Sequence, residues 1–216
     1  MEVIQNFLRI KNQISDLNSN TKLIAVSKGH SIHKIKLLID SGHLDFGENK
    51  VQEAFHKWTD ILNNNININL HLIGGLQSNK AKDAFKIFNY IHSLDSEKLA
   101  RIFSDLENND SKKIKYFIQV NIGDEIQKKG IKVSLVSDFV RYCQKDLKLN
   151  ILGLMCIPPA NVPPDSYFLK VKQLNEDSHL KDLSMGMSED FEIAIKLGST
   201  YVRVGTSIFG QRSSQF

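Results

Sequence analysis

Short apolar runs alternate with amphipathic segments along nearly the whole chain, and this alternation limits the folds that the chain can adopt. Eight runs have the composition of buried strands, and a segment with helical spacing of apolar residues follows nearly every one of them. Strict alternation of strand and helix favours a parallel sheet with right-handed crossovers. The expected strands lie at 23–26, 43–48, 68–74, 88–95, 114–123, 149–155, 183–187 and 200–205.

Eight strand–helix units are the number that closes a (β/α)8 barrel of the TIM type. The same alternation allows an open, doubly wound sheet, but the count of units favours the barrel. A further amphipathic segment at 3–17 precedes the first strand and predicts an extra N-terminal helix. No linker, repeat or low-complexity run divides the sequence, so we expect a single domain over residues 1–216.

Composition narrows the classes of function. Of the 216 residues, 41% are hydrophobic and 24% charged, and the net charge of +4 comes from scattered lysines. This pattern is typical of a globular protein and gives little support to nucleic-acid binding. No stretch has the ~18 uncharged apolar residues of a membrane span, and the N-terminus lacks the apolar centre of a signal peptide. Cys143 and Cys156 lack metal-ligand spacing, so we expect thiols in a reducing cytoplasm and no metal site.

The carboxyl ends of the expected strands meet at one mouth of the barrel, where active sites of this fold form. The last two strands lead into "SMGMSEDF" and "VGTSIFG", two loops of small residues that each open a helix. Backbone N–H groups at helix N-termini bind anions, and the loops after strands 7 and 8 recurrently hold phosphate. Each loop alone is most simply a tight turn, whereas the adjacent pair favours a phosphate site.

Lys28 follows the first strand, in "LIAVSKGHS", and faces the same mouth. A single lysine at a strand end is most simply a solvated residue. In a partly dry pocket its amine is neutral more often and can attack a carbonyl. An aldehyde that carries a phosphate fits both the lysine and the loops. Pyridoxal phosphate and the sugar phosphates of Schiff-base aldolases are two such molecules.

Arg203 helps to distinguish pyridoxal phosphate from the sugar phosphates. In "YVRVG" it alternates with Val202 and Val204, which predicts that it points into the barrel while the valines face the helices. A buried guanidinium is costly unless it is paired. Facing a pyridine nitrogen, it would keep that nitrogen unprotonated. The alternative is a structural ion pair with Glu48 or Asp95.

Seven segments, in this order, resemble the pyridoxal phosphate homeostasis protein family. They cover about residues 20–210 and read "AVSK", "DFGENKVQE", "IGGLQSNKAK", "HSLDSEKLA", "VNIGDEIQKKGI", "GLMCIPP" and "LSMGMSEDFEIAIKLGSTYVRVGTSIFG". The resemblance implies a single barrel similar to the N-terminal domain of alanine racemase, with pyridoxal 5'-phosphate as the cofactor. It implies a protein that carries or buffers this cofactor and supports vitamin B6 and amino-acid homeostasis.

The resemblance also implies which residues form the site. Lys28 matches the lysine that forms a Schiff base with the cofactor, Arg203 matches the arginine that faces the pyridine nitrogen, and Asn49 matches an asparagine near the cofactor. The residues that match the two phosphate loops are Ser184, Gly186, Met187, Gly205 and Thr206. One position departs from the family, because Gly75 stands where a histidine is usual.

A pyridoxal-phosphate-dependent amino-acid racemase is the alternative function. Racemisation needs a base on each face of the substrate carbanion, and Lys28 supplies one. In alanine racemase the second base comes from a second domain of the partner subunit, whereas this sequence ends at Phe216, soon after the eighth strand. We therefore expect no catalytic residue and no significant activity. We expect a cytoplasmic monomer whose partners are pyridoxal phosphate and the apo-enzymes that receive it, without nucleic-acid or membrane binding.

Overall fold

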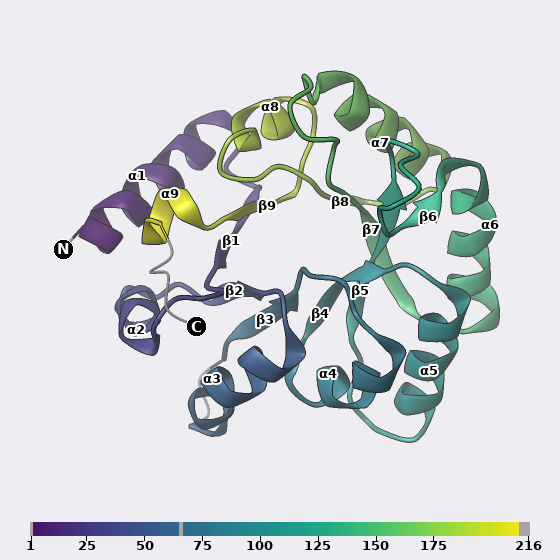
Figure 1. Cartoon of the computed structure of the whole chain (residues 1–216), viewed down its shortest axis with the longest axis horizontal. Helices are drawn as coiled ribbons and strands as arrows, with labels where there is room; N and C mark the ends of the chain where they lie inside the picture. Colours follow the sequence, from purple (N-terminus) through teal and green to yellow (C-terminus); the bar gives the residue numbers. More distant parts are fainter. Residues whose placement is uncertain (1, 65–66, 212–216) are drawn as a thin grey trace.

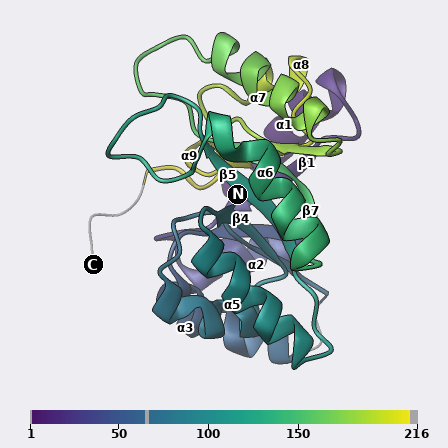
Figure 2. The same cartoon turned by 90° about the vertical axis from the view of Figure 1, so that its right-hand side faces the viewer.

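The computed structural model describes residues 2–64 and 67–211. Eight parallel strands form a closed barrel with helices on its outer side (Figure 1). Seen from the side, helices lie on both sides of the strands (Figure 2). The strands of the barrel are β1 (Lys22–Val26), β2 (Asp45–Glu48), β3 (Asn69–Leu72), β4 (Tyr90–Leu94), β5 (Lys115–Asn121), β7 (Asn150–Cys156), β8 (Asp182–Ser184) and β9 (Tyr201–Val204).

Strand pairing decides between the two expected architectures. The strands follow one another in the order β4, β3, β2, β1, β9, β8, β7 and β5, and β5 pairs back with β4. This last pairing closes the sheet, so the barrel is confirmed and the open doubly wound sheet is excluded. The chain forms a barrel because each strand is followed by a segment whose apolar side covers the outer face of the sheet.

The helices on the outer side begin with α1, the expected N-terminal helix. Their bounds are α1 (Glu2–Leu17), α2 (Ile32–Asp40), α3 (Val51–Asn63), α4 (Ala81–Ile87), α5 (Glu97–Asn108), α6 (Val136–Arg141), α7 (Asp165–Asp177), α8 (Phe191–Lys196) and α9 (Thr206–Phe209). Short 3-10 turns precede α4 at Ser78–Lys80 and α6 at Val133–Leu135, and a π-helical turn at Tyr142–Asp146 follows α6. Among the described residues, no helix is long and apolar enough to cross a membrane.

Alternation along the strands divides the core into two parts. Outward side chains such as Leu23 and Ala25 belong to the large cluster between the strands and the helices. Inward side chains fill the barrel and form a second apolar cluster of Ile24, Tyr90, Phe117, Met155 and Tyr201. Side chains at every second position of a strand share a face, so this alternation also determines which polar residues enter the barrel.

Two strand predictions need correction. The two-residue strand β6 (Ile131–Lys132), which pairs with the end of β5, was not predicted because two residues carry no periodic pattern. The expected strand at 183–187 ends at Ser184. Gly186 has a φ of +93° there, and a left-handed residue of this kind turns the backbone away from the sheet.

Candidate functional site

Lys28 lies just beyond the end of β1 and is partly buried. The inward alternation of Ile24 and Val26 continues to Lys28, so its side chain starts on the barrel side. Gly29 follows with a φ of +69°, which turns the chain away from the mouth toward α2. The lysine is thus presented by the short turn that leaves the strand.

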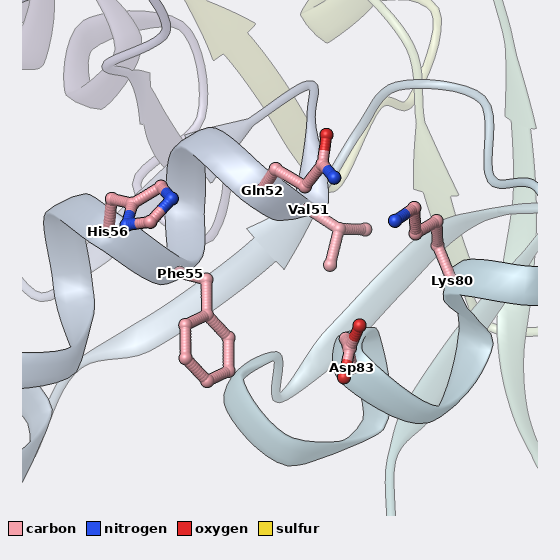
Figure 3. A pocket seen from close by; sticks show the side chains of 6 residues that line it. All are labelled: Val51, Gln52, Phe55, His56, Lys80 and Asp83. Atoms are coloured by element: carbon pink, nitrogen blue, oxygen red, sulfur yellow. The ribbon is translucent and has the colours of Figure 1, made fainter.

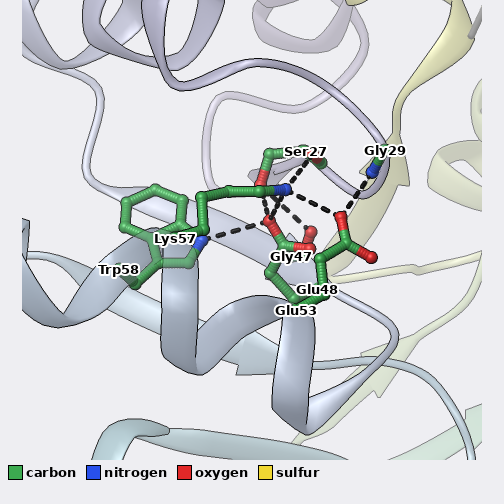
Figure 4. Close-up of polar contacts among 7 residues, drawn as sticks. All are labelled: Ser27, Gly29, Gly47, Glu48, Glu53, Lys57 and Trp58. Atoms are coloured by element: carbon green, nitrogen blue, oxygen red, sulfur yellow. Dashed lines mark hydrogen bonds and ion pairs between the residues drawn. The ribbon is translucent and has the colours of Figure 1, made fainter. Parts of the chain in front are cut away.

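Helix α3 holds the backbone on both sides of Lys28 (Figure 4). Lys57 Nζ donates to the carbonyl oxygen of Ser27 at 2.9 Å, and the N–H of Gly29 donates to Glu53 Oε1 at 2.6 Å. Lys57 and Glu53 also form an ion pair at 2.9 Å, one helical turn apart. Two linked side chains of one helix therefore fix the two peptide groups that flank the lysine.

Glu48 completes this cluster from the end of β2. Its Oε1 accepts hydrogen bonds from Ser27 Oγ at 2.6 Å, Lys57 Nζ at 2.9 Å and Trp58 Nε1 at 3.1 Å. Its side chain is fully buried, and this burial raises the pKa of the carboxyl group although Lys57 opposes the shift. Glu48 is therefore the partner of Lys57 and lies on the helix side of the sheet.

Arg203 points into the barrel as expected, and its residue is only 4% exposed. Its guanidinium donates to Ser184 Oγ at 2.7 Å and to the carbonyl oxygen of Cys156 at 3.0 Å. Neither Glu48 nor Asp95 is among these partners, so the predicted alternative of a structural ion pair with either residue is not observed. The last residues of β7 and β8 therefore hold the guanidinium in place through these two hydrogen bonds.

The loops after β8 and β9 contact each other. The N–H of Gly205 donates to Ser188 Oγ at 3.3 Å, which joins the two loops. A Cβ on Gly205 would lie 3.2 Å from the carbonyl oxygen of Val26, so the β9 loop passes close to the end of β1. Thr206 is exposed in the first turn of α9. The structure thus brings Gly205 and Thr206 next to the turn that carries Lys28.

The β8 loop is shaped by Gly186, where a Cβ would lie 2.6 Å from the Cβ of Ala194. Only glycine fits this combination of close packing and positive φ. The next residue, Met187, donates its backbone N–H to Asp190 Oδ1 at 2.6 Å. The backbone N–H of Met187, a residue that the resemblance places in a phosphate loop, therefore already has the Asp190 side chain as its partner in this structure.

Ser184 lies inside the barrel below these loops and is fully buried. Its Oγ accepts from Arg203 and lies 2.8 Å from His92 Nδ1. Alternation turns its side chain inward before the loop begins, so its hydroxyl has its partners inside the barrel, and the assignment of Ser184 to the phosphate stays a prediction. Ser188, the second serine of "SMGMS", is partly buried in the loop itself.

Asn49 lies between β2 and α3, and its Oδ1 is a buried atom that has no hydrogen-bond partner among the described residues. A Cβ on Gly74 would lie 2.3 Å from the backbone carbonyl oxygen of Asn49, so the β3 loop packs directly against it. A buried amide oxygen without a donor fits a site that a polar ligand completes.

A separate surface pocket lies between α3 and α4 (Figure 3). None of the residues predicted for the site lines it, and its only large apolar side chain, Phe55, is 37% exposed. We therefore place the candidate site at the barrel mouth. The pocket is lined by Val51, Gln52, Phe55, His56, Lys80 and Asp83.

Comparison with known proteins identifies the family of this chain. The model of the alanine racemase N-terminal domain family matches residues 2–213. A pyridoxal phosphate homeostasis protein of Pasteurella multocida is 36% identical, over 98% of this chain and 95% of its own. The chain belongs to the pyridoxal phosphate homeostasis protein family. The family's Escherichia coli member is 34% identical, over 88% of this chain and 85% of its own.

Solved structures show the same barrel. PipY of Synechococcus elongatus, whose structures are titled as without PLP and with PLP bound, is 32% identical. The two structures match 93% of this chain and all of theirs, with TM-scores of 0.83 and 0.79. Alanine racemase of Corynebacterium glutamicum matches with a TM-score of 0.73, but at 15% identity it supports the fold alone. The pyridoxal phosphate homeostasis protein fold is thus that of the racemase barrel.

The glycine that departs from the family pattern is covered by another loop. A Cβ on Gly75 would lie 3.0 Å from both Cδ and Nζ of Lys129, which comes from the segment between β5 and β6. The space beside Gly75 therefore holds a lysine side chain from elsewhere in the sequence.

Buried histidines make the stability of this family member sensitive to acid. Burial lowers the pKa of His71 and His92, and it lowers the pKa of His43 to about 4. In the unfolded chain each histidine takes up a proton below about pH 6.5. The unfolded state therefore takes up protons at a higher pH than the folded state. The stabilisation that the neutral buried histidines give the folded state is complete above pH 6.5 and is lost below it.

We expect the free energy of unfolding to fall between pH 7 and pH 5.5, by about 1 kcal/mol for His43 alone and further because of His71 and His92. The raised pKa values of Glu48 and Asp95, both due to burial, act in the opposite direction and reduce the loss. Urea unfolding followed by circular dichroism measures the difference. A flat profile would contradict neutral buried histidines.

Proposed function

We propose that this protein binds pyridoxal 5'-phosphate at the barrel mouth and holds it for release to other proteins. The observation that carries the proposal is the convergence of three elements at one mouth. These are the Lys28 turn fixed by α3, the joined loops after β8 and β9, and the inward guanidinium of Arg203. The PipY structure titled as having PLP bound and the names of the relatives support the same ligand.

The residues of this mouth fit the ligand. Gly186, Ser188, Gly205 and Thr206 would hold the phosphate, because small residues let backbone N–H groups approach an anion. Met187 joins them if its N–H leaves Asp190. Asn49 offers an amide oxygen that has no partner among the described residues, and Arg203 would face the ring nitrogen. When bound, the cofactor's aldehyde condenses reversibly with the Lys28 amine, which keeps it from reacting with other amines and thiols.

The chain's own residues favour storage over catalysis. Arg203 carries a charge at neutral pH and cannot accept a proton there, so it keeps the ring nitrogen beside it unprotonated. A neutral ring nitrogen weakens the ring as an electron sink, which raises the barrier of most reactions on the cofactor. We therefore propose a cytoplasmic monomer without significant activity of its own, whose partners are apo-enzymes that need the cofactor. The racemase alternative rests on a shared fold alone.

The test follows the cofactor through capture and release. Apo-protein is incubated with pyridoxal phosphate, separated from unbound cofactor and mixed with an apo-form of a pyridoxal-phosphate-dependent enzyme. We expect about one cofactor per chain, restored activity of the recipient, and no more than trace formation of D-alanine from L-alanine. Failure to retain the cofactor contradicts the proposal. Racemisation near the ordinary enzymatic rate of about 10 s⁻¹ contradicts it too and supports the racemase.

A further inference from the structure

Five polar side chains form a continuous hydrogen-bonded line through the inside of the barrel. Asp45 Oδ1 lies 3.1 Å from His71 Nε2, and His71 Nδ1 lies 2.9 Å from His92 Nε2. His92 Nδ1 lies 2.8 Å from Ser184 Oγ, which accepts from Arg203 at 2.7 Å. We call these five residues the barrel relay. Each comes from a different strand, so only the closed barrel brings them together.

The barrel relay runs along the barrel axis. Asp45 is the first residue of β2 and lies at the amino end of the strands, whereas Ser184 is the last residue of β8, at the carboxyl end. His71, His92 and Ser184 are all 0% exposed. The line therefore connects a carboxylate at one mouth with a guanidinium under the other, without contact with water in its middle.

The direction of every hydrogen bond in the line is determined by its two ends. Burial opposes ionisation of Asp45, but its hydrogen bonds to His71 and Asn69 hold its pKa below the ordinary value, so it is a carboxylate that only accepts. His71 Nε2 must then donate, which leaves Nδ1 of this neutral ring as the acceptor for His92 Nε2–H. At the other end Arg203 only donates, so Ser184 Oγ accepts from it. The serine O–H then donates to His92 Nδ1, and the two assignments meet without conflict.

A line in which all donors point the same way orients the last group in it. Each hydrogen bond polarises the next, and the negative end at Asp45 strengthens the acceptor that Arg203 meets. The guanidinium has few alternatives, because its other described partner is the carbonyl oxygen of Cys156. Its planar geometry is thus held by two acceptors on neighbouring strands.

We propose that Ser184, His92, His71 and Asp45 are positioning residues that hold the Arg203 guanidinium against the ring nitrogen of the bound cofactor. They act on the protonation of that nitrogen through Arg203 and do not touch the ligand themselves. This inference rests on the proposed function, since it requires pyridoxal phosphate at the mouth. It assigns the control of the ring nitrogen partly to Asp45, at the opposite end of the barrel.

The test measures the protonation of the ring nitrogen directly. Pyridoxal phosphate labelled with ¹⁵N in the ring is bound to each variant, and its nitrogen chemical shift is measured at pH 7. In the parent we expect the position of an unprotonated pyridine. In Ser184→Ala the signal should move toward the pyridinium position. In Asp45→Asn it should move in the same direction by a smaller amount. Ser184→Thr, which keeps the hydroxyl, should restore the parent position.

Two matched controls separate positioning from general damage. Ser93 is also fully buried, but its hydroxyl has no hydrogen-bond partner among the described residues, so Ser93→Ala makes the same change outside the barrel relay. Asp182 is the first residue of β8, at the same mouth as Asp45, and Asp182→Asn is its control. Both controls should keep the parent signal.

The outcomes distinguish the two proposals. If the parent retains no labelled cofactor, the proposed function fails. If the parent binds it but Ser184→Ala leaves the nitrogen signal unchanged, the barrel relay does not position Arg203 and the inference is overturned. An equal shift in Ser184→Ala and Ser93→Ala overturns it as well, because loosening of the core then explains both. Thermal unfolding of each variant, followed by circular dichroism, verifies that the barrel remains folded.

Discussion

Replacement of Lys28 by alanine is expected to abolish covalent capture of pyridoxal phosphate and to leave the barrel folded. Lys28 lies beyond the last residue of β1 and is only partly buried, so its truncation removes little core packing. The parent is incubated with one equivalent of cofactor, reduced with borohydride and digested. Mass spectrometry should then find the pyridoxyl group on Lys28, and no equivalent adduct in Lys28→Ala.

The matched control is Lys50→Ala, an exposed lysine at the start of α3 near the same mouth. It should keep the full adduct at Lys28, because it removes neither Lys28 nor the hydrogen bonds that hold the Lys28 turn. A stoichiometric adduct on another lysine of the parent would show that the aldehyde binds elsewhere.

The second large effect is a loss of stability in Lys57→Met, because this change leaves the Glu48 carboxylate buried without its cation. Breaking a buried ion pair by removal of one partner costs about 3–5 kcal/mol. Here the Glu48 side chain is fully buried and that of Lys57 is 12% exposed, so solvent screens the pair little. Urea unfolding at pH 7 measures the loss. The control is Lys86→Met, which breaks the ion pair between Lys86 and Asp83. Both of these side chains are about half exposed, so the loss of stability should be less than about 1 kcal/mol.

A double variant tests the reason for this loss. If the unpaired charge is responsible, Glu48→Gln combined with Lys57→Met should recover most of the stability, because an amide needs no cation. A double variant that is as unstable as Lys57→Met would point instead to the lost contacts of Lys57 with Ser27 and Glu53.

Periodicity was sufficient to predict the barrel and insufficient for parts of its mouth. Alternation predicted that Arg203 points inward, and the same rule applied to "LSM" would have turned Ser184 inward as well. The resemblance instead assigned Ser184 to a phosphate loop that begins after it. The partners of Arg203 could not be predicted, because Ser184 and Cys156 reach it only through the pairing of three strands. Distant pairing of this kind depends on register, which a single sequence does not encode locally.

The side chain of Lys129 over Gly75 limits which residues the β3 loop can carry. Lys129 comes from the segment between β5 and β6, so this contact joins that segment to the loop after β3. A Cβ at position 75 would lie 3.0 Å from both Cδ and Nζ of Lys129. The lysine side chain must therefore move before position 75 can carry a side chain of its own.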